Sequence, residues 1–230
     1  MISLFLASLL FVVIHALISG TSLRGKLVAR MGEKVYSSLF SFLSALSLAW
    51  MIITFSEAPH MELWAPMTAL KHLAMPLMLI ACVLVVLAFT TPNPTSVVGG
   101  GKSLREEDAA KGIIKITRHP FLVGVTIWSV AHMLANGDLA SMLFFGGFLV
   151  LSLIGPPQID AKREAKNAES WARFARQTSW LPFAAIIEGR TKVTLGEIGW
   201  AGIIGGVALY LAILLFFHTW AFGVTVHPFR

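Results

Sequence analysis

Residues 116–154 read ITRHPFLVGVTIWSVAHMLANGDLASMLFFGGFLVLSLI, and they carry the strongest indication of the architecture. It holds two apolar segments, Pro120–Ala135 and Leu139–Ile154, which are separated only by Asn136-Gly137-Asp138. Neither segment alternates with the two-residue period of a strand, and both are longer than the strands of a membrane barrel. The Asn-Gly-Asp sequence favours a tight turn. The stretch therefore predicts two short helices joined as an antiparallel hairpin.

Further apolar segments extend this pattern in both directions. They are Ile2–Ser19, Tyr36–Phe55, His72–Phe89 and Ile198–Phe222. A helix that crosses a bilayer needs about 20 mainly apolar residues, which these segments approach or exceed. We expect the first segment to be a retained helix rather than a cleaved signal peptide, because it lacks a basic leading region.

The composition agrees with a location in lipid. Of the 230 residues, 56% are hydrophobic and only 13% are charged, and the mean hydropathy is +0.76. Soluble domains carry about 25% charged residues, so an ordinary soluble enzyme, a coiled coil and a disordered chain are excluded. The sequence predicts an all-α polytopic membrane helix bundle. We expect one domain over residues 1–230 with six transmembrane helices.

The basic residues are distributed very unevenly about these segments. The chain has 18 Lys and Arg residues and a net charge of +6. Sixteen of the 18 fall in the loops after the first, third and fifth segments, whereas Lys71 and Arg230 fall on the other side. Cytoplasmic loops are the ones enriched in Lys and Arg. We therefore expect a bacterial-type inner membrane protein with both termini periplasmic, and we attribute the charge to topology rather than to nucleic-acid binding.

Two segments have patterns that predict helix contacts. In Asp160–Thr178 the residues Trp171, Phe174 and Ala175 recur at helical spacing, with basic residues on the other faces. This predicts a cytoplasmic amphipathic helix that lies on the membrane surface or caps the bundle. Gly202–Gly206 contains a small-xxx-small pattern, which allows close helix contact within the bundle or across a homodimer.

The histidines are the main candidates for function, because ionisable residues inside a membrane are rarely placed there without a role. His15, His72, His132 and His218 lie inside or at the edge of predicted helices, whereas His60 and His227 lie in exterior segments where we expect no such role. Neutral imidazole binds iron, zinc and copper. The chain has a single cysteine, so a haem suits this set better than a zinc site. The alternative is that each histidine hydrogen-bonds a neighbouring helix.

His132 is the first candidate for an axial ligand. Trp128 and His132 share one helix face, so Trp128 is placed to pack on a bound ring. At 1.5 Å per residue His132 lies roughly 5–8 Å below the outer boundary, His72 a few Å deep and His15 about 20 Å deep. Two axial ligands must share a depth, so straight helices favour His72 or His218 over His15 as the partner.

Three motifs resemble the NnrU family of membrane proteins. They are residues 15–24 (HALISGTSLR), residues 116–132 (ITRHPFLVGVTIWSVAH) and residues 178–190 (TSWLPFAAIIEGR). The resemblance covers about residues 15–190. The family includes the plant and cyanobacterial 15-cis-zeta-carotene isomerase, a haem b protein.

The resemblance to the NnrU family implies a function and a ligand pair. It implies haem b as cofactor, with His15 and His132 as axial ligands. It further implies either redox-gated cis–trans isomerisation of a polyene or a role in nitrite and nitric oxide metabolism. Ser129 stands where the isomerase has a cysteine proposed as a redox-dependent ligand, so this chain departs from that pattern.

A more distant resemblance concerns the residues at 118–124. Arg118-His119-Pro120 followed by Gly124 is similar to membrane methyltransferases that act on isoprenylcysteine and phospholipids. This implies a cytoplasmic polar pocket with Arg118 and His119 as candidate catalytic residues, and Glu164 beside them. The alternative is a purely structural role, in which Arg118 anchors lipid headgroups and His119-Pro120 begins a helix. A non-catalytic membrane assembly factor is the third hypothesis.

Overall fold

The structure is a computed structural model that describes residues 1–65, 67–96, 104, 109–224 and 226. Lys102, Arg105, His227 and Arg230, which the sequence arguments use, lie outside these residues. The long elements are α1 (Ile2–Val13) with the π-helix η1 (Ile14–Ser19), α2 (Leu23–Met31), α3 (Glu33–Ser56), α4 (Thr68–Thr90), α6 (Pro120–Asn136), α7 (Leu139–Lys166), α8 (Ala168–Gln177), and α11 (Trp200–Ala212) with η3 (Ile213–Phe217) and α12 (His218–Phe222). The short helices are α5 (Ile113–Ile116), α9 (Ala184–Ile187) and α10 (Leu195–Ile198).

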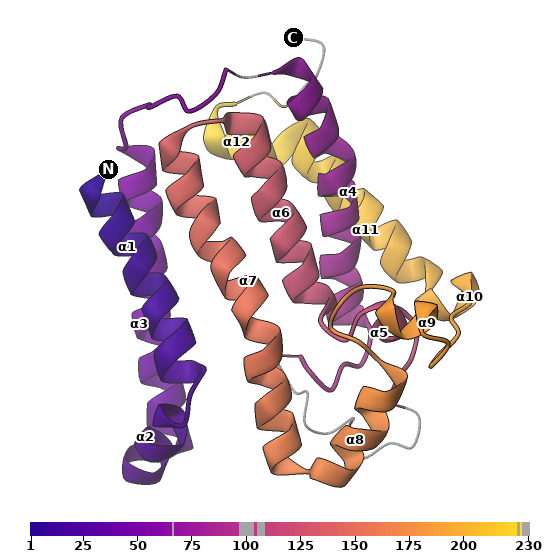
Figure 1. The fold of residues 1–230 in the computed structure, drawn as a ribbon. Coiled ribbons are helices and arrows are strands. Elements are labelled where there is room, and N and C mark those ends of the chain that lie inside the picture. The colour runs from indigo at the N-terminus through magenta and orange to yellow at the C-terminus, as the bar shows by residue number, and fades with distance from the viewer. Residues whose placement is uncertain (66, 97–103, 105–108, 225, 227–230) are drawn as a thin grey trace.

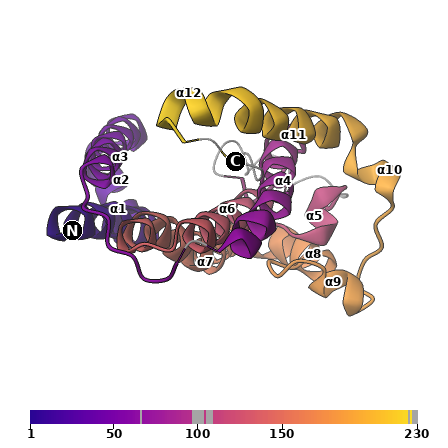
Figure 2. The ribbon, with the colours of Figure 1, turned by 90° about the horizontal axis from the view of Figure 1, so that it is seen from above.

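The long helices stand side by side as a bundle (Figure 1). Helix α6 packs on α4 and α7, α11 packs on α4, and α1 packs on α3 and α7. Seen from above, α1, α7, α6 and α4 follow one another in a row, with α3 and α11–α12 behind its two halves (Figure 2). We call the end with Met1 and the α6–α7 turn the upper end, and the end with α2, α5 and α8 the lower end.

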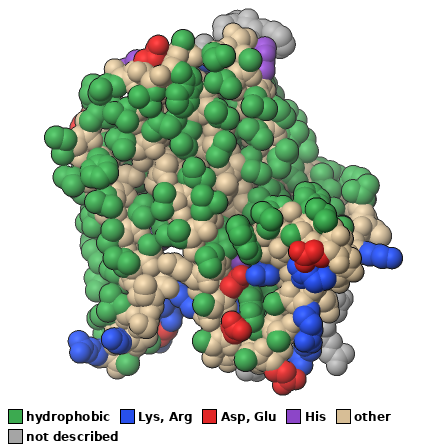
Figure 3. Space-filling view, viewed as in Figure 1, with side chains coloured by type: hydrophobic (Ala, Val, Ile, Leu, Met, Phe, Trp, Pro, Cys, Tyr) green, Lys and Arg blue, Asp and Glu red, His purple; other side chains and the backbone are tan. Residues whose placement is uncertain are grey.

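The class predicted from sequence is confirmed. Among the described residues, five continuous helical segments are long and apolar enough to cross a membrane, and they begin at residues 2, 33, 68, 139 and 200. The sixth expected span, α6, has 17 residues and therefore lies at the short limit for a bilayer. Large apolar side chains cover the outside of the bundle (Figure 3). Phe42 is 64% exposed and Trp220 81%, as expected for side chains that face lipid.

The predicted turn between the fourth and fifth spans is confirmed. Helix α6 ends at Asn136 and α7 begins at Leu139. Gly137 has φ of 67°, and a Cβ there would lie 2.6 Å from the carbonyl oxygen of Trp64, so only glycine fits. The Asp138 carboxylate caps α7 by accepting a hydrogen bond of 2.9 Å from the Ser141 amide.

The predicted ends of two segments were wrong. Helix α7 continues through Pro156 and Pro157 to Lys166, so the first part of the predicted amphipathic helix Asp160–Thr178 belongs to α7. The break comes at Asn167, whose side chain accepts a hydrogen bond of 3.0 Å from the Ser170 amide and starts α8. The two prolines lose their backbone donors, but the surrounding bundle keeps the helix continuous.

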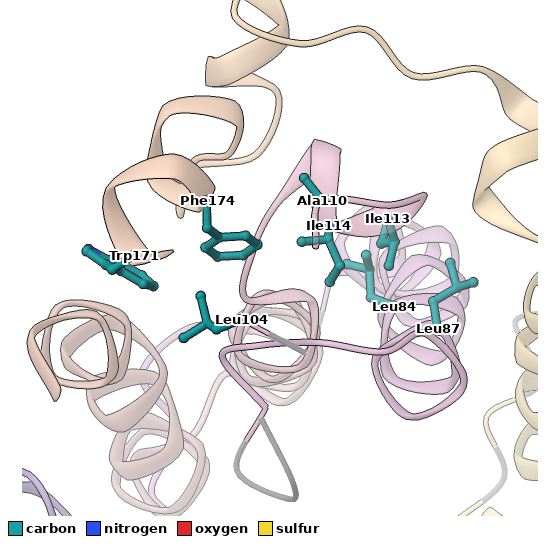
Figure 4. Close-up of a cluster of buried hydrophobic side chains, with 8 residues drawn as sticks. All are labelled: Leu84, Leu87, Leu104, Ala110, Ile113, Ile114, Trp171 and Phe174. Carbon is teal, nitrogen blue, oxygen red and sulfur yellow. The ribbon is translucent and has the colours of Figure 1, made fainter. Parts of the chain in front are cut away.

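Helix α8 caps the bundle. Trp171 and Phe174 of α8 are 5% and 3% exposed, and Figure 4 shows Phe174 beside Leu104 and close to Ile114. The same cluster contains Leu84 and Leu87 of α4. Of the two predicted roles for the amphipathic segment, the structure therefore shows the cap.

The small-residue pattern of α11 is used inside the molecule. A Cβ on Gly202 would lie 2.5 Å from the Leu87 side chain, and one on Gly206 would lie 2.4 Å from the Val83 Cα. The glycines thus allow α11 to approach α4 closely. At the lower end α10 is tied to α5 by an ion pair of 2.6 Å between Lys115 and Glu197, which holds the pKa of that carboxyl below its usual range.

Candidate functional site

A cavity of about 450 Å³ lies at the upper end of the bundle. Three of the candidate histidines, His72, His132 and His218, line it from α4, α6 and α12. Apolar side chains such as Met75 and Met78 supply most of the remaining wall. The volume falls within the range of about 300–1,000 Å³ that is typical of small-molecule sites. We call this space the upper cavity.

The imidazole of His132 is held in one orientation. Its Nδ1 lies 2.9 Å from the carbonyl oxygen of Trp128, one turn earlier in α6, and its ring stacks on Phe145 at 4.5 Å. A carbonyl only accepts hydrogen bonds, so Nδ1 carries the proton and Nε2 keeps the lone pair that binds a metal. His218 has the same arrangement, with Nδ1 at 2.9 Å from the Val224 carbonyl. Metal-binding histidines are commonly oriented by such a bond.

The donor set of the upper cavity fits a haem better than a bare metal ion. Within the described residues, no group of three His, Cys, Asp or Glu side chains could hold a metal ion. Cys82 does not line the cavity. A haem brings four equatorial nitrogens and needs only one or two axial donors from the protein. His132 together with His72 or His218 offers such donors.

His15 does not line the upper cavity. Its Nδ1 lies 2.8 Å from the Phe11 carbonyl, which leaves Nε2 as the ligand nitrogen here as well. Its ring contacts Phe11 at 4.4 Å and Phe40 of α3 at 5.4 Å. The structure thus places His15 apart from the group that the depth estimate favoured, which is His72, His132 and His218.

A continuous series of aromatic contacts joins His15 to His132. Phe11 contacts Phe148 of α7 at 5.2 Å, Phe148 contacts Trp128 at 5.3 Å, and Trp128 contacts His132 at 5.2 Å. We call these five residues the aromatic wall. Trp128 belongs to this wall and does not line the upper cavity, and its packing on a bound ring stays a prediction.

The directions of the two helices reduce the difference in depth between His15 and His132. Side chains tilt toward the N-terminus of their own helix. Since α1 runs from the upper end downward and α6 runs upward, the two imidazoles tilt toward each other, and each contacts an aromatic ring one turn earlier in its helix. The depth estimate from Cα positions therefore exaggerated their separation.

Two further positions near His132 bear on the site. His60, for which we expect no role as a ligand, lines the upper cavity from the loop before α4. No signal in the sequence marked it, because the loop is brought to the cavity by tertiary packing. Ser129 is fully buried, its hydroxyl has no hydrogen-bond partner among the residues that the structure describes, and it does not line the cavity.

Arg118 and His119 form a largely buried cluster with Asp160 at the lower end. The Asp160 carboxylate accepts bonds from Arg118 Nε at 3.0 Å and Nη2 at 2.6 Å, and lies 2.8 Å from His119 Nε2. His119 is only 2% exposed, and the Arg118 guanidinium also lies over the Trp171 ring at 5.3 Å. We call these three residues the Arg118 cluster. Sequence reasoning missed the role of Asp160, because its partners are about 40 positions away in the chain.

Two of the motif segments meet at this cluster. Arg118 N donates to the Ser179 carbonyl at 2.8 Å, and Phe183 N donates to the Ile116 carbonyl at 2.8 Å. Arg190 donates from Nη1 to the carbonyl oxygens of Ala175, Arg176 and Thr178 at the end of α8. The segments 116–124 and 178–190 thus act together to fasten α8 to the bundle.

Comparisons with known proteins agree with the motifs. The family described as NnrU protein matches residues 3–226. The 15-cis-zeta-carotene isomerase of Zea mays is 38% identical over 82 residues, and that of Arabidopsis thaliana is 37% identical over 79 residues. These matches cover 36% and 34% of this chain but only 22% of each relative, so the chain spans about a fifth of their length. No solved structure matches it significantly.

Proposed function

This chain belongs to the NnrU family, and from that premise we propose that it binds haem b within the membrane through His132. The observation that carries the proposal is the upper cavity, where His132 meets His72 and His218 among apolar side chains. The hydrogen bond from His132 Nδ1 to the Trp128 carbonyl leaves the lone pair on Nε2, where it can bind a metal.

The second axial ligand is His15 or one of the two other cavity histidines, His72 and His218, and a different observation supports each case. His72 lines the same cavity as His132. The aromatic wall connects His15 to His132. In both histidines Nδ1 donates a hydrogen bond to the carbonyl oxygen one turn earlier in the helix. The family pattern supports His15, whereas the cavity supports His72.

We further propose that the protein isomerises an extended apolar polyene. The two plant relatives are described as 15-cis-zeta-carotene isomerases. A bound haem would supply redox and Lewis-acid chemistry for a conjugated chain. Apolar side chains of the upper cavity would contact the substrate, while the Trp128 carbonyl keeps His132 in the ligand tautomer.

The remaining hypotheses receive less support from the geometry. For a methyltransferase, Arg118 and His119 would have to face a cofactor, but both are engaged with Asp160, and His119 is buried. Glu164 is exposed on α7 and has no part in that cluster. A role in nitrite and nitric oxide metabolism, or as an assembly factor, rests on the family alone.

The absorption spectrum of the detergent-solubilised protein tests haem binding. Protein made in haem-sufficient cells should show a Soret band, which His132→Ala should abolish. The control His60→Ala, also at the upper cavity, should keep the band. Of His15→Ala, His72→Ala and His218→Ala, the one that removes or shifts the band identifies the second ligand. Wild-type protein without haem would overturn the proposal.

A further inference from the structure

Three basic side chains from distant parts of the chain converge at the lower end. Arg24 lies on α2, and Lys162 and Arg163 lie on the last turns of α7. Arg24 is close enough to repel both of the α7 charges, and Lys162 and Arg163 repel each other. We call these three residues the basic cluster. None of them belongs to the Arg118 cluster or to the upper cavity.

The basic cluster lies where the first membrane span ends. Lys162 Nζ donates a hydrogen bond to the carbonyl of Ser19, which is the last residue of η1. One turn further up α7, Gln158 Nε2 donates to the Ala16 carbonyl at 3.3 Å. The end of a spanning helix is the depth at which lipid phosphates lie. The three charges therefore stand at headgroup level.

Acidic side chains neutralise this cluster only in part. Arg24 pairs with Glu33 at 2.5 Å. Within the described residues, Lys162 and Arg163 form no ion pair with a carboxylate, and they donate hydrogen bonds to the carbonyls of Ser19 and Ser96. Those bonds use one of the three donors of the lysine and one of the five of the arginine. The remaining donors and two uncompensated charges favour an anion.

The surroundings suit a lipid rather than a soluble anion. Leu17 of η1 and Leu23 of α2, next to the cluster in sequence, are 54% and 41% exposed, as expected for side chains that face acyl chains. Figure 3 shows a hollow in the lower end of the molecule with Lys or Arg side chains on its wall. A phosphate at this depth would have cations beside it and apolar surface above it.

We propose that Arg24, Lys162 and Arg163 bind the phosphodiester headgroup of an anionic phospholipid. The lipid joins α2 to α7, which are distant in sequence, and offsets the repulsion among the three cations. The proposal does not rest on haem binding, since neither His132 nor the upper cavity takes part in it.

The test compares two triple variants that remove the same charge. In one, Arg24, Lys162 and Arg163 are each replaced by Gln; in the control, Lys26, Arg30 and Lys34, which are exposed at the same end, are each replaced by Gln. The measurements are phosphatidylglycerol retained in native mass spectrometry and the shift in melting temperature on adding phosphatidylglycerol or phosphatidylcholine. Each charge removed from the cluster should weaken phosphatidylglycerol binding about fivefold, while the control keeps it.

The outcomes separate the competing explanations. Equal stabilisation by the two lipids, or an equal loss in both triple variants, would overturn the proposal. Equal stabilisation by inorganic phosphate would show a general anion site and overturn the lipid assignment. The same measurements on haem-free His132→Ala protein should show the same stabilisation by phosphatidylglycerol as wild-type protein. The lipid proposal can therefore be tested even if the protein does not bind haem.

Discussion

At the scale of single residues, Asp160 connects more elements of the structure than the candidates that the motifs suggested. Its two oxygens hold Arg118 and His119, and the Arg118 side chain also donates to the Thr178 carbonyl at 3.2 Å. One carboxylate thereby connects α7 to the start of α6 and to the end of α8. A buried charge without a partner is costly, and the Asp160 carboxylate supplies the counter-charge that offsets this cost for Arg118.

Asp160→Asn should destabilise the protein by about 3 kcal/mol, because it leaves the Arg118 guanidinium largely buried without a counter-charge. The loss is measured as a fall in thermal stability in detergent. Glu164→Gln removes an exposed carboxylate from the same helix and should change the stability by less than about 0.5 kcal/mol. Equal effects of the two variants would contradict a structural role for Asp160.

Sequence reasoning found some of these residues and missed others for a definite reason. His132 and His119 stand out because an ionisable residue in or beside an apolar segment is rare. Asp160 and His60 have no such local signal, since each gains its importance from residues far away in the chain. The choice between His15 and His72 also depends on contacts across helices, which spacing alone does not supply.

At the scale of elements, the close contact between α11 and α4 explains the glycines of α11. Gly206 faces the backbone of Val83, and Gly205 meets only the Val86 side chain at 3.3 Å. The pattern predicted close contact but left open whether it lay within one molecule or between two. The structure shows this contact inside the bundle, between α11 and α4.

Gly206→Ala should destabilise the bundle by about 1–3 kcal/mol, since its Cβ would meet backbone atoms that do not give way. Gly146→Ala, in α7 where a Cβ meets nothing within 4 Å, should be neutral or slightly stabilising. Melting in detergent measures both variants, and size-exclusion chromatography should show no change in oligomeric state. A change of oligomeric state in Gly206→Ala but not in Gly146→Ala would contradict this assignment and indicate that the motif forms a dimer interface.

At the scale of the whole molecule, the described cations divide between the two ends. Lys71 lies toward the upper end, and the other described Lys and Arg residues lie at the lower end. Figure 3 shows the blue side chains gathered there on one face. The positive-inside rule then supports our proposal that the lower end is cytoplasmic and the termini are periplasmic.

Cysteine labelling in intact cells tests this orientation. In a Cys82→Ala background, Glu62→Cys in the upper loop should react with a membrane-impermeant maleimide. Glu169→Cys at the start of α8, where the native side chain is 85% exposed, should react only after lysis. Both positions are exposed, so a difference reports sidedness rather than burial. The reverse pattern would invert the topology.

The sequence by itself determined the helical class, the positions of the spans, the α6–α7 turn and the one-sided charge. These follow from local hydrophobicity and turn chemistry, which act within a few residues. Only the tertiary structure decided the length of α7, the place of α11 and the residues that surround His132. Those features depend on which side chains meet across helices, and a contact such as Asp160 with Arg118 leaves no periodic signal in the chain.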